Sequence, residues 1–193
     1  SGGAPGNPQL PGRMVRWALP PDAQMDSVKM EISAMDVEES EGTFDLPPAP
    51  PMATFDTNGH PVISWGETPV RLIRDGRNTE VYEQDAFFPA SPVMLLPYGQ
   101  LRKWQFAQIA FSPVQYNPVT GRIRVVRRIE LALHYQTSPA LNALSPEVPA
   151  VWRDEKMADR AAELLDNYEA IRPAYATYAV NAPTDGSGAD FVI

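Results

Sequence analysis

Residues 112–121 read Ser-Pro-Val-Gln-Tyr-Asn-Pro-Val-Thr-Gly, and residues 122–135 continue as Arg-Ile-Arg-Val-Val-Arg-Arg-Ile-Glu-Leu-Ala-Leu-His-Tyr. After Gly121 the apolar residues fall mostly on odd positions, the period of two that is typical of a strand with one buried face. Pro118 fixes its own φ angle and Gly121 tolerates a positive φ, so the chain is expected to reverse there. The stretch therefore predicts a β-hairpin that leads into a long antiparallel strand.

The expected partner of this long strand is residues 101–111. Trp104 and Phe106 share one parity in this segment, whereas Ile109 and Phe111 share the other. A bulge residue near Ala107 or Gln108 would produce such a change of phase.

Upstream of this hairpin, the sequence predicts short extended elements separated by turns. Proline occurs 21 times, which argues against a helical bundle. The expected elements are strands at 13–19 and 28–33, a solvated turn in the acidic run 36–41, polyproline II at 46–51, and short edge strands at 69–73 and 79–82.

Downstream, residues 154–171 are rich in Ala, Glu, Leu and Lys and carry apolar residues at three- and four-residue spacing, which predicts one amphipathic helix ended by Pro173. A flexible linker is expected at 181–189, and 190–193 is an apolar run of the kind that opens a strand. The fold class is thus all-β, a mainly antiparallel, jelly-roll-like β-sandwich with one C-terminal amphipathic helix. The predicted domains are a β-sandwich at 1–140, a helical extension at 141–180, and a linker with the start of a further domain at 181–193.

Composition excludes several function classes. The formal charge is −8, and such an acidic chain lacks the surplus of Lys and Arg that general nucleic-acid binding needs. The absence of cysteine removes disulfides, thiolate metal sites and a cysteine nucleophile from this chain. No run is long and apolar enough for a membrane span, and no signal peptide opens the sequence, which we interpret as a mature or excised fragment.

The hairpin segment 113–120 and several other segments resemble the propeptide of gingipain-type cysteine peptidases of clan CD, family C25. The further segments similar to that family, in its order, are Gly6–Pro11, Val28–Ile32, Leu46–Pro50, Phe87–Pro89, Leu165–Glu169 and Asp190–Ile193. The last of these is similar to the first strand of the catalytic domain, whose His and Cys the chain lacks. The family's propeptides usually have further strands before the first of these segments, so the chain is expected to lack an N-terminal part.

The resemblance implies a propeptide domain that is not itself catalytic, keeps a secreted or cell-surface cysteine peptidase latent, and assists its folding. The implied partner is the cognate peptidase domain, with no cofactor, no metal and no nucleic acid. In the family a loop of the propeptide enters the peptidase's active-site cleft, and the corresponding loop here is 50–87.

The residue that would fill the peptidase's specificity pocket stays open. By position along the loop, Asp56 lies where the family places its plug, which would suit a pocket that prefers acids. For a pocket that prefers bases the candidates are Arg71, Arg74 and Arg77, since a guanidinium pairs bidentately with a carboxylate. The plainer interpretations are a turn-forming role for Asp56 and solvated loop charges for the arginines.

Three other groups of residues have alternative interpretations. Arg122, Arg124 and Arg128 share the polar face of the long strand. They are candidates for docking on the peptidase domain, and the plainer interpretation is that they form a solvated face of the strand. His60 and His134 carry no sign of a metal site or triad. The four tryptophans would suit the alternative function, a carbohydrate-binding or adhesive module of a secreted enzyme, but Trp17 and Trp104 are expected in the core.

Overall fold

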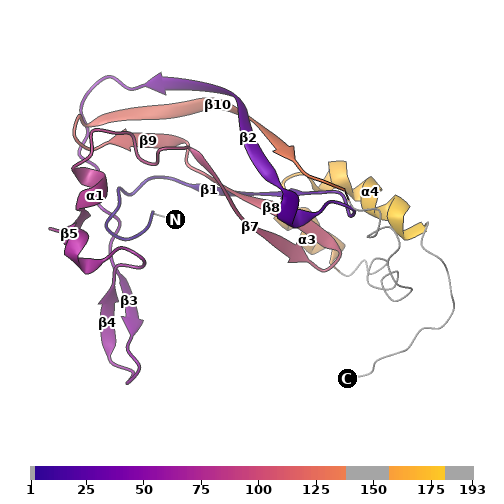
Figure 1. The fold of residues 1–193 in the computed structure, drawn as a ribbon, viewed down its shortest axis with the longest axis horizontal. Helices are drawn as coiled ribbons and strands as arrows, with labels where there is room; N and C mark the ends of the chain where they lie inside the picture. The colour runs from indigo at the N-terminus through magenta and orange to yellow at the C-terminus, as the bar shows by residue number, and fades with distance from the viewer. Residues whose placement is uncertain (1–2, 138–156, 181–193) are drawn as a thin grey trace. The chain divides into compact units, whose positions relative to one another are not determined.

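The computed structural model describes residues 3–137 and 157–180 of the chain (Figure 1). The strands are β1 (Arg13–Ala18), β2 (Lys29–Glu39), β3 (Met52–Phe55), β4 (Pro61–Ser64), β5 (Ile73–Arg74), β6 (Arg77–Asn78), β7 (Val93–Leu101), β8 (Trp104–Phe111), β9 (Val114–Asn117) and β10 (Arg122–His134). The helices are the 3₁₀ turns η1 (Met25–Ser27) and η2 (Val70–Leu72), and the α-helices α1 (Thr79–Tyr82), α3 (Ala158–Leu164) and α4 (Tyr168–Val180).

The strands form two three-stranded sheets, ordered β1-β8-β7 and β2-β10-β9, and two small hairpins, β3-β4 and β5-β6. The predicted fold class, mainly antiparallel β with helix at the C-terminal end, is confirmed. The chain divides into two compact units, of which unit 1 comprises 1–13, 32–94 and 110–131, and unit 2 comprises 14–31, 95–109 and 132–193. The boundaries expected at 140 and 180 stay a prediction, and the linker and the run 190–193 lie outside the described residues.

The predicted reversal at Pro118–Gly121 is confirmed as the turn between β9 and β10. Asn117 pairs with Arg122, and Val114 pairs with Val125. Gly121 has φ of 69°, and a Cβ added there would lie 3.0 Å from the carbonyl oxygen of Phe44. Glycine is therefore required at this position by both its conformation and the crowding around it.

The expected partner of the long strand is wrong. β10 lies between β9 and β2, whereas β8, which covers most of 101–111, lies between β1 and β7. The short turn places Val114–Asn117 directly opposite the start of β10, and Pro113, which has no N–H to donate, separates β9 from β8. Within β8 the buried positions change from Trp104 and Phe106 to Ala107 and Ile109, so the phase change occurs where it was predicted.

The acidic run is a strand rather than a solvated turn. β2 extends through Asp36 to Glu39, well beyond the end predicted near Ser33. Glu39 receives hydrogen bonds from the Arg124 guanidinium at 2.7 and 2.9 Å. The pattern of the run alone did not reveal that arginines on a distant strand lie opposite these carboxylates.

The long segment 50–87 is folded into small elements. The edge strand expected at 69–73 is mostly the turn η2, with only Ile73 in a strand. The edge strand expected at 79–82 is wrong, because this segment forms the single helical turn α1. The side chain of Asn78 accepts a hydrogen bond from the N–H of Glu80 at 3.1 Å, and this N-cap favours a helix over a strand.

The C-terminal helix is present but in two pieces. α3 ends at Leu164, and the chain leaves the helix because the N–H of Asp166 donates to the carbonyl of Arg16 on β1 at 2.9 Å. α4 then begins at Tyr168 and contains Pro173, which was expected to end the helix. The predicted residues 154–156 lie outside the described residues.

These helices belong to the core of unit 2. Tyr175 is fully buried, with its ring centroid 4.3 Å from that of Trp104, and its hydroxyl donates to the carbonyl of Leu19 at 2.8 Å. Burial raises the pKa of Tyr175 far above its ordinary value. The buried residues of this core are Ala18, Trp104, Phe106, Ala161, Leu165, Tyr168 and Tyr175.

Candidate functional site: the exposed hairpin and the motifs at its base

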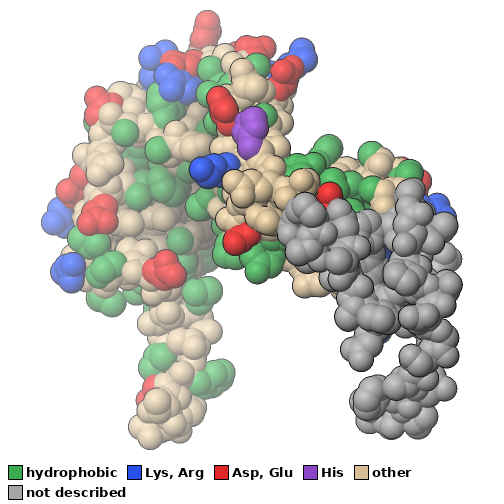
Figure 2. Space-filling view, turned by 45° about the vertical axis from the view of Figure 1, so that its right-hand side comes forward, with side chains coloured by type: hydrophobic (Ala, Val, Ile, Leu, Met, Phe, Trp, Pro, Cys, Tyr) green, Lys and Arg blue, Asp and Glu red, His purple; other side chains and the backbone are tan. Residues whose placement is uncertain are grey.

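The β3-β4 hairpin of unit 1 is exposed at nearly every position of its two strands. Ala53 pairs with Ile63 and Phe55 pairs with Pro61, and because side chains alternate along a strand, these four residues share one face. Phe55 and Ile63 are each 72% exposed. The hairpin extends from the β5 and α1 region of unit 1, and Figure 2 shows hydrophobic side chains along it. This face is entirely apolar, in a position where no described part of unit 1 covers it.

The tip of the hairpin is closed by Asp56. Its Oδ1 accepts hydrogen bonds from the N–H groups of Asn58 and His60, both at 2.8 Å, and its Oδ2 lies 3.3 Å from Nδ1 of His60. The backbone N–H of His60 is the largest cause of a pKa of Asp56 below its ordinary value. Gly59 completes the turn with φ of 82°. The carboxylate is thus engaged within the hairpin itself.

The three candidate arginines lie in the segment that follows the hairpin. Arg74 pairs with Glu83 at 3.0 Å, and Arg77 pairs with Asp45 at 2.8 Å while its guanidinium lies 4.8 Å from the centre of the Tyr82 ring. Burial is the main cause of a Tyr82 pKa raised to about 12. Arg71, on the turn η2, is exposed, and within residues 3–137 and 157–180 it makes no ion pair.

The base of the hairpin is fixed by the N-terminal segment of the chain. Gly6 donates to the carbonyl of Ala49 at 2.9 Å, the N–H of Ala49 donates to the carbonyl of Asn7 at 2.7 Å, and Asn78 donates to Gly6 at 2.8 Å. A Cβ on Gly6 would lie 2.7 Å from Cδ1 of Ile73. The segment Gly6–Pro11 therefore holds the chain on both sides of the hairpin, just before β3 and just after β5.

A second set of contacts joins strand β9 to the segment Phe87–Pro89. Phe88 and Tyr116 exchange two backbone hydrogen bonds, each 2.8 Å long. The Tyr116 side chain is 1% exposed, and its hydroxyl donates to the carbonyl of Phe44 at 3.0 Å. Segments that are remote in the sequence thus meet in unit 1, a proximity that sequence spacing alone did not reveal.

The candidate docking arginines on β10 are paired with carboxylates of unit 1. Arg122 and Arg124 both bind Glu39, at 2.9 and 2.7 Å, and Arg128 binds Glu130 at 2.5 Å. Arg124 also lies over the Phe87 ring, 3.9 Å from its centre. Hydrogen bonding from Arg124 is the main cause of a Glu39 pKa below its ordinary value. Figure 2 shows the resulting mixture of basic and acidic side chains over β2 and β10.

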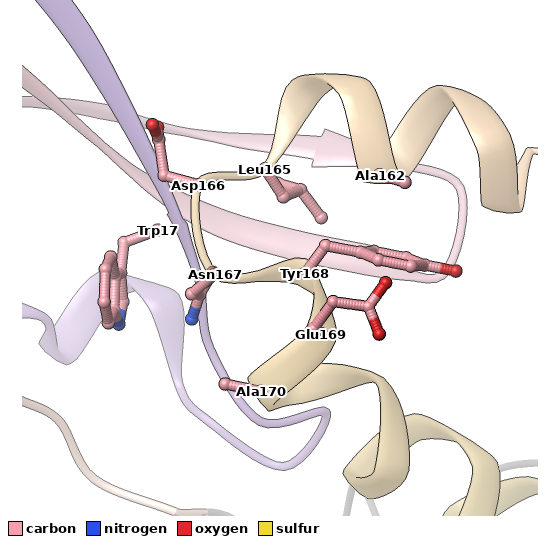
Figure 3. Close-up of a pocket in the computed structure, with 8 residues that line it drawn as sticks. All are labelled: Trp17, Ala162, Leu165, Asp166, Asn167, Tyr168, Glu169 and Ala170. Carbon is pink, nitrogen blue, oxygen red and sulfur yellow. The ribbon is translucent and has the colours of Figure 1, made fainter.

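Unit 2 carries a cavity of about 450 Å³ at the start of α4, which the sequence did not predict (Figure 3). The expectation of Trp17 in the core is wrong: it is 44% exposed there, because side chains alternate along β1 and the neighbouring Ala18 takes the buried side. Asn167 closes the open edge of β1, since its amide accepts from the N–H of Ala18 at 2.8 Å and donates to the Ala18 carbonyl at 2.9 Å. The lining residues are Trp17, Ala162, Leu165, Asp166, Asn167, Tyr168, Glu169 and Ala170.

In unit 1, His60 lies beside Asp56, and in unit 2, His134 lies 3.5 Å from Glu31. Among the described residues, no three side chains of the His, Cys, Asp and Glu types gather as metal ligands would. Nor does this part of the chain contain a helix of the length and apolarity that crossing a membrane requires.

Comparison with known proteins supplies the remaining evidence. The family model Propeptide_C25 matches residues 1–171 of the chain. The fold is similar to that in the complex of Porphyromonas gingivalis RgpB pro- and mature domains, with 22% identity, a TM-score of 0.52, and coverage of 86% of this chain and 73% of that chain. A structure on the zymogenic latency of gingipain K from the same organism matches at 18% identity and a TM-score of 0.48, covering 72% of this chain and 70% of that one. No curated protein matches the sequence.

Proposed function

Because the chain belongs to the family of C25 peptidase propeptides, we propose that it keeps a cognate C25-type cysteine peptidase latent and assists its folding. The chain contains no cysteine, so it does not carry such a peptidase's nucleophile. The proposed partner is the peptidase domain, in cis or after cleavage, as in the complex of RgpB pro- and mature domains. The proposed location is secreted or at the cell surface.

The observation that carries this proposal is the exposed β3-β4 hairpin. Inhibition by a substrate-like element is favoured when the segment projects and is already ordered, because ordering it on binding would cost conformational entropy. The hairpin meets both conditions, since its two strands pair through four residue pairs and Phe55 and Ile63 are each 72% exposed. The contacts of Gly6 and Asn7 with Ala49 hold its base in place.

Within this proposal, the contacts of the four candidate plug residues favour different roles. Asp56 already accepts two backbone hydrogen bonds, so entering a pocket would require it to leave the turn. Arg74 and Arg77 would have to break ion pairs, whereas exposed Arg71 would not. We therefore propose the apolar face of the hairpin as the main contact, Asp56 as the residue that shapes its tip, and Arg71 as the first basic candidate.

Peptidase docking by Arg122, Arg124 and Arg128 is a secondary part of the proposal. Arg122 and Arg124 share Glu39, so a peptidase carboxylate would have to compete with an existing pair. Arg128, whose side chain is 75% exposed, is the most accessible of the three.

The test is inhibition of the purified cognate peptidase domain by the chain. The double variant Phe55→Ser, Ile63→Ser should weaken inhibition by about tenfold or more, because exposed aromatic and aliphatic anchors often dominate an interface. The matched control is Val119→Ser, since Val119 is 54% exposed in unit 1 but lies in the β9-β10 turn. Absence of inhibition by the unaltered chain would contradict the proposed function.

Two further single variants separate the pocket residues. Arg71→Ala should weaken inhibition if a basic side chain enters the pocket. Asp56→Asn should weaken inhibition only by loosening the hairpin turn, where the Asp56 carboxylate accepts two hydrogen bonds. An equal loss of inhibition in the control Val119→Ser and in the hairpin variant would contradict the assignment of the contact to the hairpin, while leaving latency itself intact.

The cavity in unit 2 favours carbohydrate binding as a second candidate function. An exposed tryptophan that lines a cavity, as Trp17 does, is a common platform for a sugar ring (Figure 3). The amide of Asn167, however, is already bonded to Ala18 through both its oxygen and its nitrogen. Quenching of Trp17 fluorescence by glycans, with loss in Trp17→Ala and no inhibition of the peptidase, would support this function instead.

A further inference from the structure

We propose that Asn58 is a site of spontaneous deamidation and that its conversion to isoaspartate unlocks the β3-β4 hairpin. Asn58-Gly59 is the single Asn-Gly pair in the sequence. Glycine has no side chain to obstruct its own nitrogen, so that nitrogen can approach the carboxamide of the preceding asparagine. The proposal concerns a covalent modification and does not depend on the identity of the partner.

The side chains around the pair leave room for the reaction, which also requires the Gly59 N–H to release its hydrogen bond to the Asp56 carbonyl at 3.0 Å. Thr57, Asn58, Gly59 and His60 are all exposed, and a Cβ added to Gly59 would meet no atom within 4 Å. The Asn58 side chain makes no hydrogen bond within the described parts of the chain. The charged or titratable groups at the tip are Asp56 and His60, which bond to each other.

The chemistry needs only water. The backbone nitrogen of Gly59 attacks Cγ of Asn58, the new N–Cγ bond forms, and the Cγ–Nδ2 bond breaks. The proton from the Gly59 N–H leaves with the amide group as ammonia. Water then opens the cyclic imide at either carbonyl, which yields aspartate or isoaspartate.

Either product changes the tip of the hairpin. Aspartate adds a negative charge beside Asp56, and isoaspartate also adds a methylene group to the main chain. The tip is closed by the hydrogen bond from Asp56 N–H to the His60 carbonyl at 2.9 Å and by that from Gly59 N–H to the Asp56 carbonyl at 3.0 Å. An added main-chain atom inside this turn is incompatible with both bonds, so the paired strands would lose their closure.

The same molecule contains internal controls. Asn78 is 7% exposed, and its side-chain nitrogen donates to Oδ1 of Asn7 at 2.9 Å. Asn167 is held by Ala18 through both amide atoms. Neither is followed by glycine, and both carboxamides are fixed in place.

The experiment is incubation of the full chain in mildly alkaline buffer, followed by peptide mapping with mass spectrometry and an isoaspartate-specific methylation assay. We expect aspartate and isoaspartate to accumulate at position 58, and not at Asn78 or Asn167. No conversion at Asn58, or conversion no faster than at the two internal controls, would overturn the proposal.

The consequence for the hairpin is measured separately on aged and fresh chain. We expect amide hydrogen exchange at Thr54 and Val62, a hydrogen-bonded pair of the hairpin ladder, to be faster in the aged chain, and the variant Asn58→Gln to stay unchanged on ageing. Asn58→Asp supplies the charge without the added methylene, so equal exchange in fresh Asn58→Asp and aged chain would contradict the role of isoaspartate. A loss of peptidase inhibition on ageing is expected only if the proposed function is right. Mass spectrometry and hydrogen exchange test the modification without the peptidase, so failure of the proposed function can be told apart from failure of this inference.

Discussion

At the scale of single residues, short amide and carboxyl side chains replace backbone partners at several places in this chain. Asp56 closes the hairpin tip, Asn78 caps α1, and Asn167 bonds to both polar atoms of Ala18. Such local bonding explains why these residue types favour turns and caps over regular strands and helices. Their positions mark where elements end rather than where chemistry occurs.

The substitution Asn167→Ala should lower the free energy of unfolding of unit 2 by about 2 kcal/mol, because it leaves the N–H and carbonyl of buried Ala18 without these partners. Urea denaturation followed by near-UV circular dichroism would measure the loss. The control is Glu169→Gln, which changes an exposed carboxylate in the first turn of α4, two residues after Asn167. Equal stability of Asn167→Ala and the unaltered chain would contradict the role given to this amide.

At the scale of elements, β2 and β10 are joined by ion pairs as well as by backbone bonds. Glu39 binds Arg122 and Arg124, and Glu38 binds Arg127 at 2.8 Å. Exposed pairs of this kind contribute little singly, but a network of them favours one register of the two strands. Arg122 and Arg124, which are candidates for docking on the peptidase, therefore also stabilise the pairing of β10 with β2.

The same ion pairs predict how the stability of unit 1 depends on pH. Hydrogen bonds from Arg127 and Arg124 hold the pKa values of Glu38 and Glu39 below their ordinary value of 4.5. A lowered pKa in the folded state means that the stabilisation is present above the unfolded pKa and is lost as the pH falls through the folded pKa. Stability should therefore decline as the pH falls below 4.5.

The measurement is a series of urea unfolding curves across this pH range. The double variant Glu38→Gln, Glu39→Gln should show a shallower decline, and added salt should reduce the difference. The matched control Glu41→Gln, Glu67→Gln removes the same charge at exposed positions of unit 1. An identical pH profile for the two double variants would contradict the argument.

At the scale of the whole molecule, the C-terminal helices complete the core of unit 2. The family match ends at residue 171, yet Tyr175 is fully buried beside Trp104. The core of the propeptide thus extends past the segment by which the family is identified. A cut before this tyrosine would therefore remove part of the core of unit 2.

A chain ending at residue 171 should be less stable than one ending at residue 180 by about 3 kcal/mol or more, because it loses a large buried aromatic side chain. Its Trp104 fluorescence should shift to longer wavelength as the ring becomes exposed. Thermal unfolding and tryptophan emission of the two chains would check both expectations. Equal stability would mean that the second half of α4 adds nothing to the core.

The candidate site was only partly predictable from the sequence. The segment 50–87 was identified as the candidate loop through the resemblance to the C25 propeptides, by its place after the proline-rich segment 46–51 and before Phe87–Pro89. The pairing of Arg74 and Arg77 with carboxylates, and the capture of the Asp56 carboxylate by its own turn, depend on side-chain positions that no spacing specifies. The cavity beside Trp17 likewise needed the docking of α4 against β1.

The sequence by itself determined the features that depend on neighbouring residues: the strand after Gly121, the turn at Pro118–Gly121, the phase change in β8, and the helical character near the C-terminus. Only the tertiary structure decided that β10 pairs with β2, that the acidic run extends a strand, and that the helix breaks at Asp166. The physical reason is that alternation and turn chemistry act over a few residues, whereas a strand's partners and the charges opposite it come from segments tens of residues away.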